Sequence, residues 1–395
     1  MRHKHFVFTT LLLVMIFCLA SCGHVAEAAE QTEPTPVPEP KVQIVEPAPF
    51  LAGETVEEEP AETAEPVETE EPTPEEPETR DRFINPLTGE AAESDTLGFR
   101  PYIVMINNIV VAQPHVGVSQ ADMIWELMDE GGITRMMAFF NDIRDVEKVG
   151  SIRSARWYNV SVAQAFDAYL VHAGGSQEAL DYIDYDGISD IDYVRGRYTG
   201  DTFYRDPTRQ AHGIEHSLFA TGEGIVQSAA DLGYEPLHPG WYYVYGDEFY
   251  SLHFSDTAED QCTEPANLIR LIYAGGKTTS FTYDEEKGLY TAEQYGSTYT
   301  DNGEEPVYFR NVLVLNADTV LQEDGLHLTI TMEGSGDGYF ACGGKYIPIR
   351  WEREDVLNNF QFFTEDGEPL SLGVGKSFVA VQQVGDYKGT TEFFG

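Results

Sequence analysis

The stretch from residue 23 to residue 82 most constrains how this chain folds, because it lacks the side chains that build a core. It contains 17 Glu and 11 Pro, and Phe50 is its one residue among Phe, Tyr and Trp. So little apolar surface cannot offset the entropy lost on ordering a chain, and proline and like charges keep such a segment extended. We therefore predict that residues 22–82 form a disordered acidic tether and that the fold is confined to residues 83–395. An acidic binding tail is the alternative interpretation.

The first 22 residues have the layout of a secretory leader. Arg2 and Lys4 precede an apolar run from Phe6 to Leu19, which is shorter than the roughly 20 residues that span a bilayer. The run ends in Leu-Ala-Ser-Cys, which resembles the lipobox of bacterial lipoproteins. We predict a signal peptide over residues 1–21 and acyl chains, palmitate among them, on Cys22, which would hold the protein on the extracytoplasmic side of the cell membrane. A plain secreted protein and an uncleaved anchor are the alternatives.

The charge of the chain limits its partners. Lys and Arg number 24 against 67 Asp and Glu, and the net charge is −43. Nucleic acids are bound by basic surfaces that neutralise phosphates, so we expect no nucleic acid partner. Contact with the membrane is expected through the lipid anchor alone. The roughly 310 residues after the tether are enough for two domains.

Residues 83–240 mix the patterns of strands and helices. Residues 101–107 and 169–172 are apolar runs of strand length, and residues 154–168 have apolar side chains at helical spacing. Residues 122–140 form two apolar runs around Gly-Gly, which is typical of a hairpin. These patterns predict a mixed α/β, sandwich-like N-terminal domain.

Residues 241–395 are dominated by short alternating runs, such as residues 306–316 and 377–382. This pattern predicts a mainly antiparallel β domain, so the fold class is α+β. The domain also holds Cys262 and Cys342, the two cysteines that remain after processing. An exported setting permits a disulfide between them, and two free buried thiols are the alternative.

Three short stretches of the first domain combine arginine, glycine and a helix start. Residues 131–135 close the hairpin, residues 148–156 precede the predicted helix, and residues 172–176 join a strand to a helix. Arginine forks and free backbone N–H groups at helix starts bind carboxylate or phosphate. The candidate ligand-binding residues are Arg135, Arg153, Arg156, His172, Gly174, Gly175 and Ser176.

The alternative is that the arginines are structural. Arg153 and Arg156 would then pair with Glu126, Asp129 or Glu130 and hold the hairpin in place. In so acidic a domain this interpretation is at least as strong as an anion pocket.

Two short patterns resemble metal sites, one with histidines and one with acidic residues. His212 to His216 reads His-x-x-Glu-His, the inverted zinc-protease pattern, but Gly213 weakens a helix there and no third ligand is identifiable. The acidic run at residues 181–192 has tyrosine where a calcium loop needs acids. We therefore expect no metal and no cofactor. His172 or His216 is the candidate acid or base if the protein is an enzyme.

Short stretches that recur in order along residues 83–395 carry a family resemblance: Asn85–Gly89, Val104–Asn108, Ser119–Asp122, Glu130–Arg135, Arg153–Arg156, Val171–Ser176, and Gly338–Phe340 with Trp351. In these stretches the chain resembles the YerB-like family of bacterial lipoproteins. The resemblance implies a two-part α+β fold outside the cytoplasm and brings no settled activity. A Pro-His-Asn-Leu-Tyr run of that family is matched here only at His216 and Leu218. Residues 151–156 also resemble, by analogy alone, envelope phosphotransferases that hold a lipid pyrophosphate with arginines.

Together these patterns predict a membrane-anchored lipoprotein of the cell envelope that binds an anionic ligand or a partner protein. The alternative is an envelope enzyme that acts on a phosphorylated or peptidoglycan-linked substrate.

Overall fold

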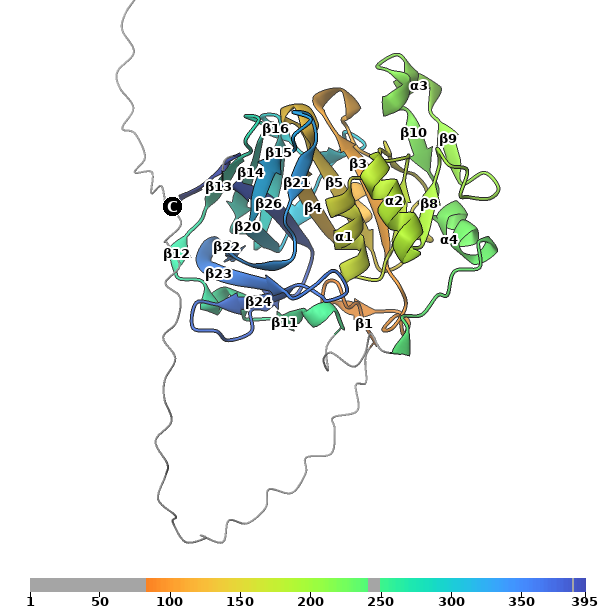
Figure 1. Ribbon diagram of the computed structural model, residues 1–395. Coiled ribbons are helices and arrows are strands. Elements are labelled where there is room, and N and C mark those ends of the chain that lie inside the picture. Colours follow the sequence, from red (N-terminus) through yellow and green to blue (C-terminus); the bar gives the residue numbers. More distant parts are fainter. Residues whose placement is uncertain (1–82, 241–248, 386) are drawn as a thin grey trace, which may run out of the picture. The chain divides into compact units, whose positions relative to one another are not determined.

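The structure is a computed structural model, and it describes residues 83–240, 249–385 and 387–395 (Figure 1). The predicted signal peptide, the lipidation site and the tether lie outside these residues. Among the residues that are described, no helix is long and apolar enough to cross a membrane.

One large mixed sheet forms the centre of the described part, and both predicted segments contribute to it. Its main path, in spatial order, is β12 (Glu264–Pro265), β23 (Lys345–Arg353), β22 (Gly334–Cys342), β20 (Asn311–Leu321), β26 (Ser377–Val384), β4 (Met123–Met128), β5 (Thr134–Phe140), β3 (Tyr102–Asn108), β7 (Tyr169–His172) and β8 (Asp190–Asp192). Two further strands attach off this path, β21 (Leu328–Ile330) to β20 and β24 (Gln361–Thr364) to β23.

The two segments meet within this sheet. Strand β26, from near the end of the chain, lies parallel to β20 on one side and parallel to β4 on the other, with Ser377 opposite Met123 and Ala380 opposite Glu126. The predicted boundary at residues 240 and 241 falls at the edge of a stretch that the structure does not describe. The division into two domains therefore stays a prediction, although the sheet itself is continuous.

Strand directions bring several chain turns to one edge of the sheet. Strands β3, β7 and β8 are mutually parallel, and β5 is antiparallel to both β3 and β4. The ends of β3, β4, β7 and β8 and the start of β5 therefore lie at the same edge, which is where ligands commonly bind in sheets of this kind. We refer to it as the carboxyl edge.

A second, antiparallel sheet comes entirely from the C-terminal segment. Its main path is β16 (Ser297–Thr298), β15 (Leu289–Gln294), β14 (Thr278–Asp284), β13 (Leu268–Ile272) and β27 (Thr390–Phe394), with β19 (Tyr308–Phe309) paired to β15. Small sheets complete the fold: β6 (Val149–Gly150) with β10 (Leu218–Ala220) and β9 (Phe203–Arg205), β1 (Phe83–Ile84) with β2 (Ala91–Ala92), β11 (His253–Ser255) with β25 (Ser371–Gly373), and β17 (Thr300–Asp301) with β18 (Glu305–Pro306).

Within the part of the chain that the structure describes, the α-helices belong to the first segment: α1 (Trp157–Ala165), α2 (Gln177–Asp186), α3 (Pro207–Gln210) and α4 (Gly222–Asp231). Ser176 accepts a hydrogen bond from Ala179 N at the start of α2, and Thr221 does the same for Gly224 N at α4. These are the N-cap bonds that the predicted helices need. Helix α1 begins three residues later than predicted, because residues 151–155 run extended. Helices α1 and α2 lie together, with the Trp157 and Tyr182 ring centroids 6.5 Å apart (Figure 1).

The apolar core is continuous across both segments. Trp125 on β4 contacts Phe166 after α1 and Phe360 before β24, with ring centroids 6.1 and 5.0 Å apart. The fold is thus mixed α+β with far more strand than helix, and the sandwich-like description of the first domain stays a prediction. Cys262 and Cys342 are both buried and are free thiols in this structure, not the disulfide that was considered.

A buried polar network also joins the segments. Glu126 on β4 is fully buried and forms an ion pair with Lys277, which lies just before β14. Four neutral donors complete the shell of the carboxylate: Asn108 Nδ2 at 2.9 Å, Thr134 Oγ1 at 2.6 Å, Tyr273 OH at 2.9 Å and Thr279 Oγ1 at 2.7 Å. Burial alone raises the pKa of Glu126, but the Lys277 ammonium outweighs it and holds the pKa below its usual range.

Candidate functional site

Residues 151–155 form an extended segment that places the predicted arginines at the carboxyl edge. Asn107 N donates to Ser151 O and Arg153 N donates to Met105 O, both at 2.9 Å, so the segment continues the sheet beside the end of β3. On its other side Ala173 N donates to Arg153 O at 3.0 Å. The backbone of Arg153 is therefore held between β3 and the chain that follows β7.

Arg135 is committed to a buried ion pair. It is the second residue of β5, is 4% exposed, and donates through Nη2 to Asp129 Oδ2, just after β4. Its Nη1 donates to the carbonyl oxygen and, at 2.8 Å, to the hydroxyl of Ser154. Breaking such a pair leaves an uncompensated buried charge, so this guanidinium is not available to a ligand.

Arg156 is committed in the same way. Its Nε and Nη2 donate to Glu130 Oε1 at 2.7 Å and Glu130 Oε2 at 2.6 Å, and its Nε lies 3.4 Å from Asp129 Oδ1. Burial raises the pKa of Glu130, but its hydrogen bonds with Arg156 outweigh that and bring the pKa to about 2. The structural interpretation, which was made for Arg153 and Arg156, thus describes Arg156. Arg135, for which it was not made, is held in the same way, and these two arginines hold the β4–β5 turn.

Arg153 differs from both. Its side chain is half-buried, and among the described residues it is the one arginine whose guanidinium has neither a hydrogen bond nor an ion pair. Its charge acts on the neighbouring Glu215 and His216. A backbone hydrogen bond is the largest cause that lowers the pKa of Glu215, and the charges of His216 and Arg153 add to it.

His216 is close enough to Arg153 to be influenced by its charge, and only one of its ring nitrogens has a hydrogen bond within the described residues. It ends the 3₁₀ helix η4 (Ile214–His216), is 6% exposed, and its Nδ1 is 2.8 Å from Asn107 Nδ2. An amide nitrogen donates, so Nδ1 accepts and the neutral ring carries its proton on Nε2. Nε2 lies 3.7 Å from Glu215 Oε1. Burial lowers the pKa of His216, so the ring is neutral at pH 7.

The zinc-protease pattern is not assembled on one helix. Helix α3 ends at Gln210, and Gly213, with φ at 121°, separates His212 from η4. His212 is exposed whereas His216 is buried. The two imidazoles therefore do not share the helical face that the motif requires.

His172 is enclosed within the sheet. It is fully buried, and its Nδ1 and Nε2 lie 2.9 Å from Gly174 O and 3.1 Å from Asp190 Oδ2. Both ring nitrogens are occupied, so His172 has no nitrogen to offer a substrate. Its position favours a structural role over the acid or base role considered from the sequence.

An acidic group beside His172 has the spacing of a metal site. His172, Asp190 and Asp192 each present one ligand atom within 4.8 Å of the others. However, Arg195 donates to Asp190 at 2.5 Å and to Asp192 at 2.9 Å, and Arg197 donates to Asp190 at 2.6 Å. These guanidinium groups occupy the oxygens that an ion would need, so the group fits a closed ion-pair network better than a metal site.

The glycine turn after β7 is also filled from within. Gly174 N donates to Asp192 Oδ1 at 2.7 Å, and Ser176 N donates to Ala155 O at 3.2 Å. The carboxylate of Asp192 thus occupies the place where an external anion was expected.

Asp192 and Asn107 were not among the site residues predicted from the sequence. The sequence did carry a signal for Asn107, which is the first of two polar residues that end the apolar strand β3.

Two donors remain at the carboxyl edge: the Arg153 guanidinium and the Nε2–H of His216. Both are N–H donors, and one carries a full positive charge. This combination is suited to an acceptor with negative charge, such as a carboxylate or phosphate.

Comparison with known proteins gives a family context. Two models of the family named protein of unknown function (DUF3048) match this chain, its N-terminal domain over residues 87–235 and its C-terminal domain over residues 269–379. The putative lipoprotein YerB of Bacillus subtilis (strain 168) is 28% identical over 311 residues, which cover 77% of this chain and 88% of that protein. The crystal structure of YerB from Bacillus subtilis is similar with a TM-score of 0.65 and 25% identity, and covers 78% of this chain and 99% of that one.

Proposed function

Because the chain belongs to the DUF3048 family of two-domain proteins, whose function is unknown, we propose its role from its own site: a lipid-anchored binding module outside the cytoplasm that takes an anionic ligand at Arg153. The anchor is Cys22, at the end of the leader. The name of its relative in Bacillus subtilis, a putative lipoprotein, supports the anchor. The anionic group can belong to a small ligand or to an envelope protein.

The observation that carries this proposal is the unpaired guanidinium of Arg153. The chain has 67 acidic against 24 basic residues, so an arginine has many acidic groups with which it could pair. Arg135 and Arg156 have taken such partners close by, while Arg153 is half-buried without one. A partly desolvated charge without a partner is unfavourable, and a ligand that supplies the anion relieves that cost.

The neighbours of Arg153 shape the ligand that fits. The Nε2–H of His216 offers a second donor, whereas the carboxylate of Glu215 repels an anion on its own side. The site therefore suits a single carboxylate or phosphate group that approaches away from Glu215. Long anionic polymers are disfavoured, because the rest of the chain is strongly acidic.

The binding test uses the full chain, purified in detergent, with inorganic phosphate and pyrophosphate as probes in isothermal titration. A charged hydrogen-bonding partner contributes about 1.5–3 kcal/mol, so Arg153→Ala should weaken binding by roughly 10- to 150-fold. Arg153→Lys keeps the charge without the fork and should bind with intermediate affinity. The matched control is Arg350→Ala, an exposed arginine on β23 that pairs with Glu352.

The result that contradicts the proposal is equal affinity of the wild type and Arg153→Ala. Circular dichroism and thermal unfolding of each variant must accompany the titration. An Arg153→Ala protein that no longer folds would show that this arginine is structural, like Arg135 and Arg156.

Catalysis is the second candidate, and the geometry of His216 is the observation that favours it. Its ring is held by Asn107 and keeps Nε2 toward the site, which is how a positioned acid or base is presented. Turnover of a phosphorylated or peptidoglycan-linked substrate that disappears in His216→Gln but persists in His212→Gln would support an enzyme. Unchanged turnover in His216→Gln would exclude this residue.

A further inference from the structure

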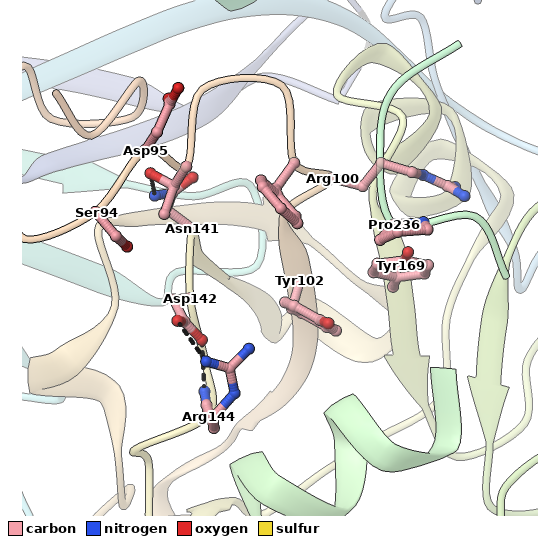
Figure 2. A pocket seen from close by; sticks show the side chains of 11 residues that line it. Ser94, Asp95, Arg100, Tyr102, Asn141, Asp142, Arg144, Tyr169 and Pro236 are labelled. Atoms are coloured by element: carbon pink, nitrogen blue, oxygen red, sulfur yellow. Dashed lines mark hydrogen bonds and ion pairs between the residues drawn. The ribbon is translucent and has the colours of Figure 1, made fainter. Parts of the chain in front are cut away.

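A pocket opens at the opposite edge of the large sheet from Arg153, where β3 and β7 begin and β5 ends (Figure 2). Its cavity volume is about 180 Å³. Side chains from several connections line it, chiefly Phe99, Arg100, Tyr102, Asp142, Arg144 and Tyr169. None of these residues takes part in the site proposed above.

Aromatic rings provide one wall of the pocket. The Tyr102 and Tyr169 rings have centroids 4.9 Å apart at an interplanar angle of 33°, and the Arg100 guanidinium covers the Tyr169 ring at 4.5 Å (Figure 2). Phe99, which also lines the pocket, is 44% exposed. Tyr169 itself is buried, so the aromatic side chains that a ligand can reach are the partly buried Tyr102 and the exposed Phe99. Aromatic side chains of this kind offer apolar contact at low cost in side-chain entropy.

The two cations of the pocket, Arg100 and Arg144, are already paired. Arg100 donates to Asp167 O at 2.7 Å and forms an ion pair with Asp167 Oδ1 at 3.1 Å. Arg144 Nη1 lies 3.6 Å from Asp142 Oδ2, and Figure 2 shows that pair beside Tyr102. Within the described residues the pocket therefore has no unpaired cation for an anionic ligand, and Asp95, which also lines it and has no ion pair there, disfavours an anion further.

A polar group remains for the ligand. The hydroxyl of Tyr102 has no hydrogen-bond partner within the described residues. Burial and the neighbouring Tyr169 raise the pKa of Tyr102 above its usual value, so the hydroxyl stays protonated and can both donate and accept. The pocket therefore combines an aromatic face with neutral hydrogen-bonding capacity.

We propose that this pocket binds one neutral sugar ring, by packing an apolar C–H face of the ring on Tyr102 and hydrogen bonding its hydroxyls to Tyr102 and to the Asp142–Arg144 pair. A free carboxylate or phosphate would find no unpaired cation here. A wholly apolar ligand would leave the Tyr102 hydroxyl without a partner, which is costly. The volume is below the range of about 300–1,000 Å³ that is typical of drug-sized ligands, so a single ring fits better than an oligosaccharide.

The probes are glucose and N-acetylglucosamine, and the readout is saturation-transfer NMR on the full chain in detergent. At least one of the two sugars should give a signal that titrates to saturation. Tyr102→Ala should lower the affinity by about tenfold, since it removes the aromatic face and the hydroxyl together. The matched control is Tyr185→Ala on α2, where the side chain is 89% exposed and lines no part of the pocket.

Two more variants keep the proposal falsifiable. Tyr102→Phe retains the ring, should fold, and should lose affinity by a few fold, so it decides the question if Tyr102→Ala does not fold. Arg153→Ala should bind the sugar as the wild type does, which separates this pocket from the anion site. The proposal is overturned if neither sugar gives a signal, or if both Tyr102 variants bind as the wild type does.

Discussion

Replacing Lys277 with methionine tests the ion pair that joins the two segments. The side chain of Lys277 is 2% exposed and that of Glu126 is fully buried, so water cannot replace the lost ammonium. Methionine has a similar length and fills the space, which limits any contribution from a cavity. The change leaves the carboxylate buried without its counter-ion and also removes the hydrogen bonds that Lys277 donates to Thr279 and Gln294.

The magnitude follows from the remaining shell of Glu126. Removing one partner of a buried ion pair costs about 3–5 kcal/mol. Here the carboxylate still accepts hydrogen bonds from Asn108, Thr134, Tyr273 and Thr279, so we expect a loss at the lower end of this range, about 3 kcal/mol at pH 7.

The loss should depend on pH. In the wild type Lys277 holds the pKa of Glu126 below its usual range, so the stability from this pair is present at pH 7 and is lost as pH falls through the folded pKa. The difference between variant and wild type should therefore shrink with falling pH, because the buried carboxylate of the variant takes up a proton.

Urea unfolding at pH 7 and pH 5, followed by tryptophan fluorescence and by circular dichroism, measures this difference. The double variant Glu126→Gln with Lys277→Met removes both charges and should recover much of the stability. A loss below about 1 kcal/mol in Lys277→Met, or a double variant less stable than the single one, would refute this reasoning.

The other expectations concern Asp122 and the lipid anchor. Burial raises the pKa of Asp122 to about 6, although Asn141 N and Asn85 Nδ2 donate to its carboxylate at 2.6 and 2.8 Å. Its contribution to stability is thus fully present below the unfolded pKa and is lost as pH rises through about 6. The free energy of unfolding of Asp122→Asn should therefore lack a pH dependence of about 2–3 kcal/mol between pH 4 and pH 7. An identical dependence in wild type and variant would show that another group titrates. Cys22→Ser should move the protein from the membrane fraction to the soluble fraction, and membrane association of the variant would contradict lipidation.

Local features of the fold were predictable from neighbouring residues. The Gly-Gly turn at Gly131 and Gly132 joins β4 to β5 as predicted, with both glycines at positive φ. Ser176 and Thr221 cap the helices that follow them. Each of these features depends on a few residues close in sequence, which is the range over which turn and capping chemistry acts.

Pairings between distant residues were not predictable in the same way. Strand β26 pairs with β4 across more than 250 positions, and Glu126 pairs with Lys277 across 151. For the arginines, the sequence supports both an anion pocket and pairing with the hairpin acids, because the residue types suit either. Only the geometry separates them: Arg135 and Arg156 take Asp129 and Glu130, and Arg153 takes none of the described acids.

The placement of β26 between β20 and β4 has a consequence for any attempt to divide this protein. A fragment that ends near residue 240 would present β4, with the sequence MIWELM, as a bare edge strand with unsatisfied backbone groups. Apolar edges of this kind recruit other chains and aggregate. The family's two domains are thus separable as sequence matches, yet a strand that begins in the second match region is needed to cover the edge of the sheet formed by the first.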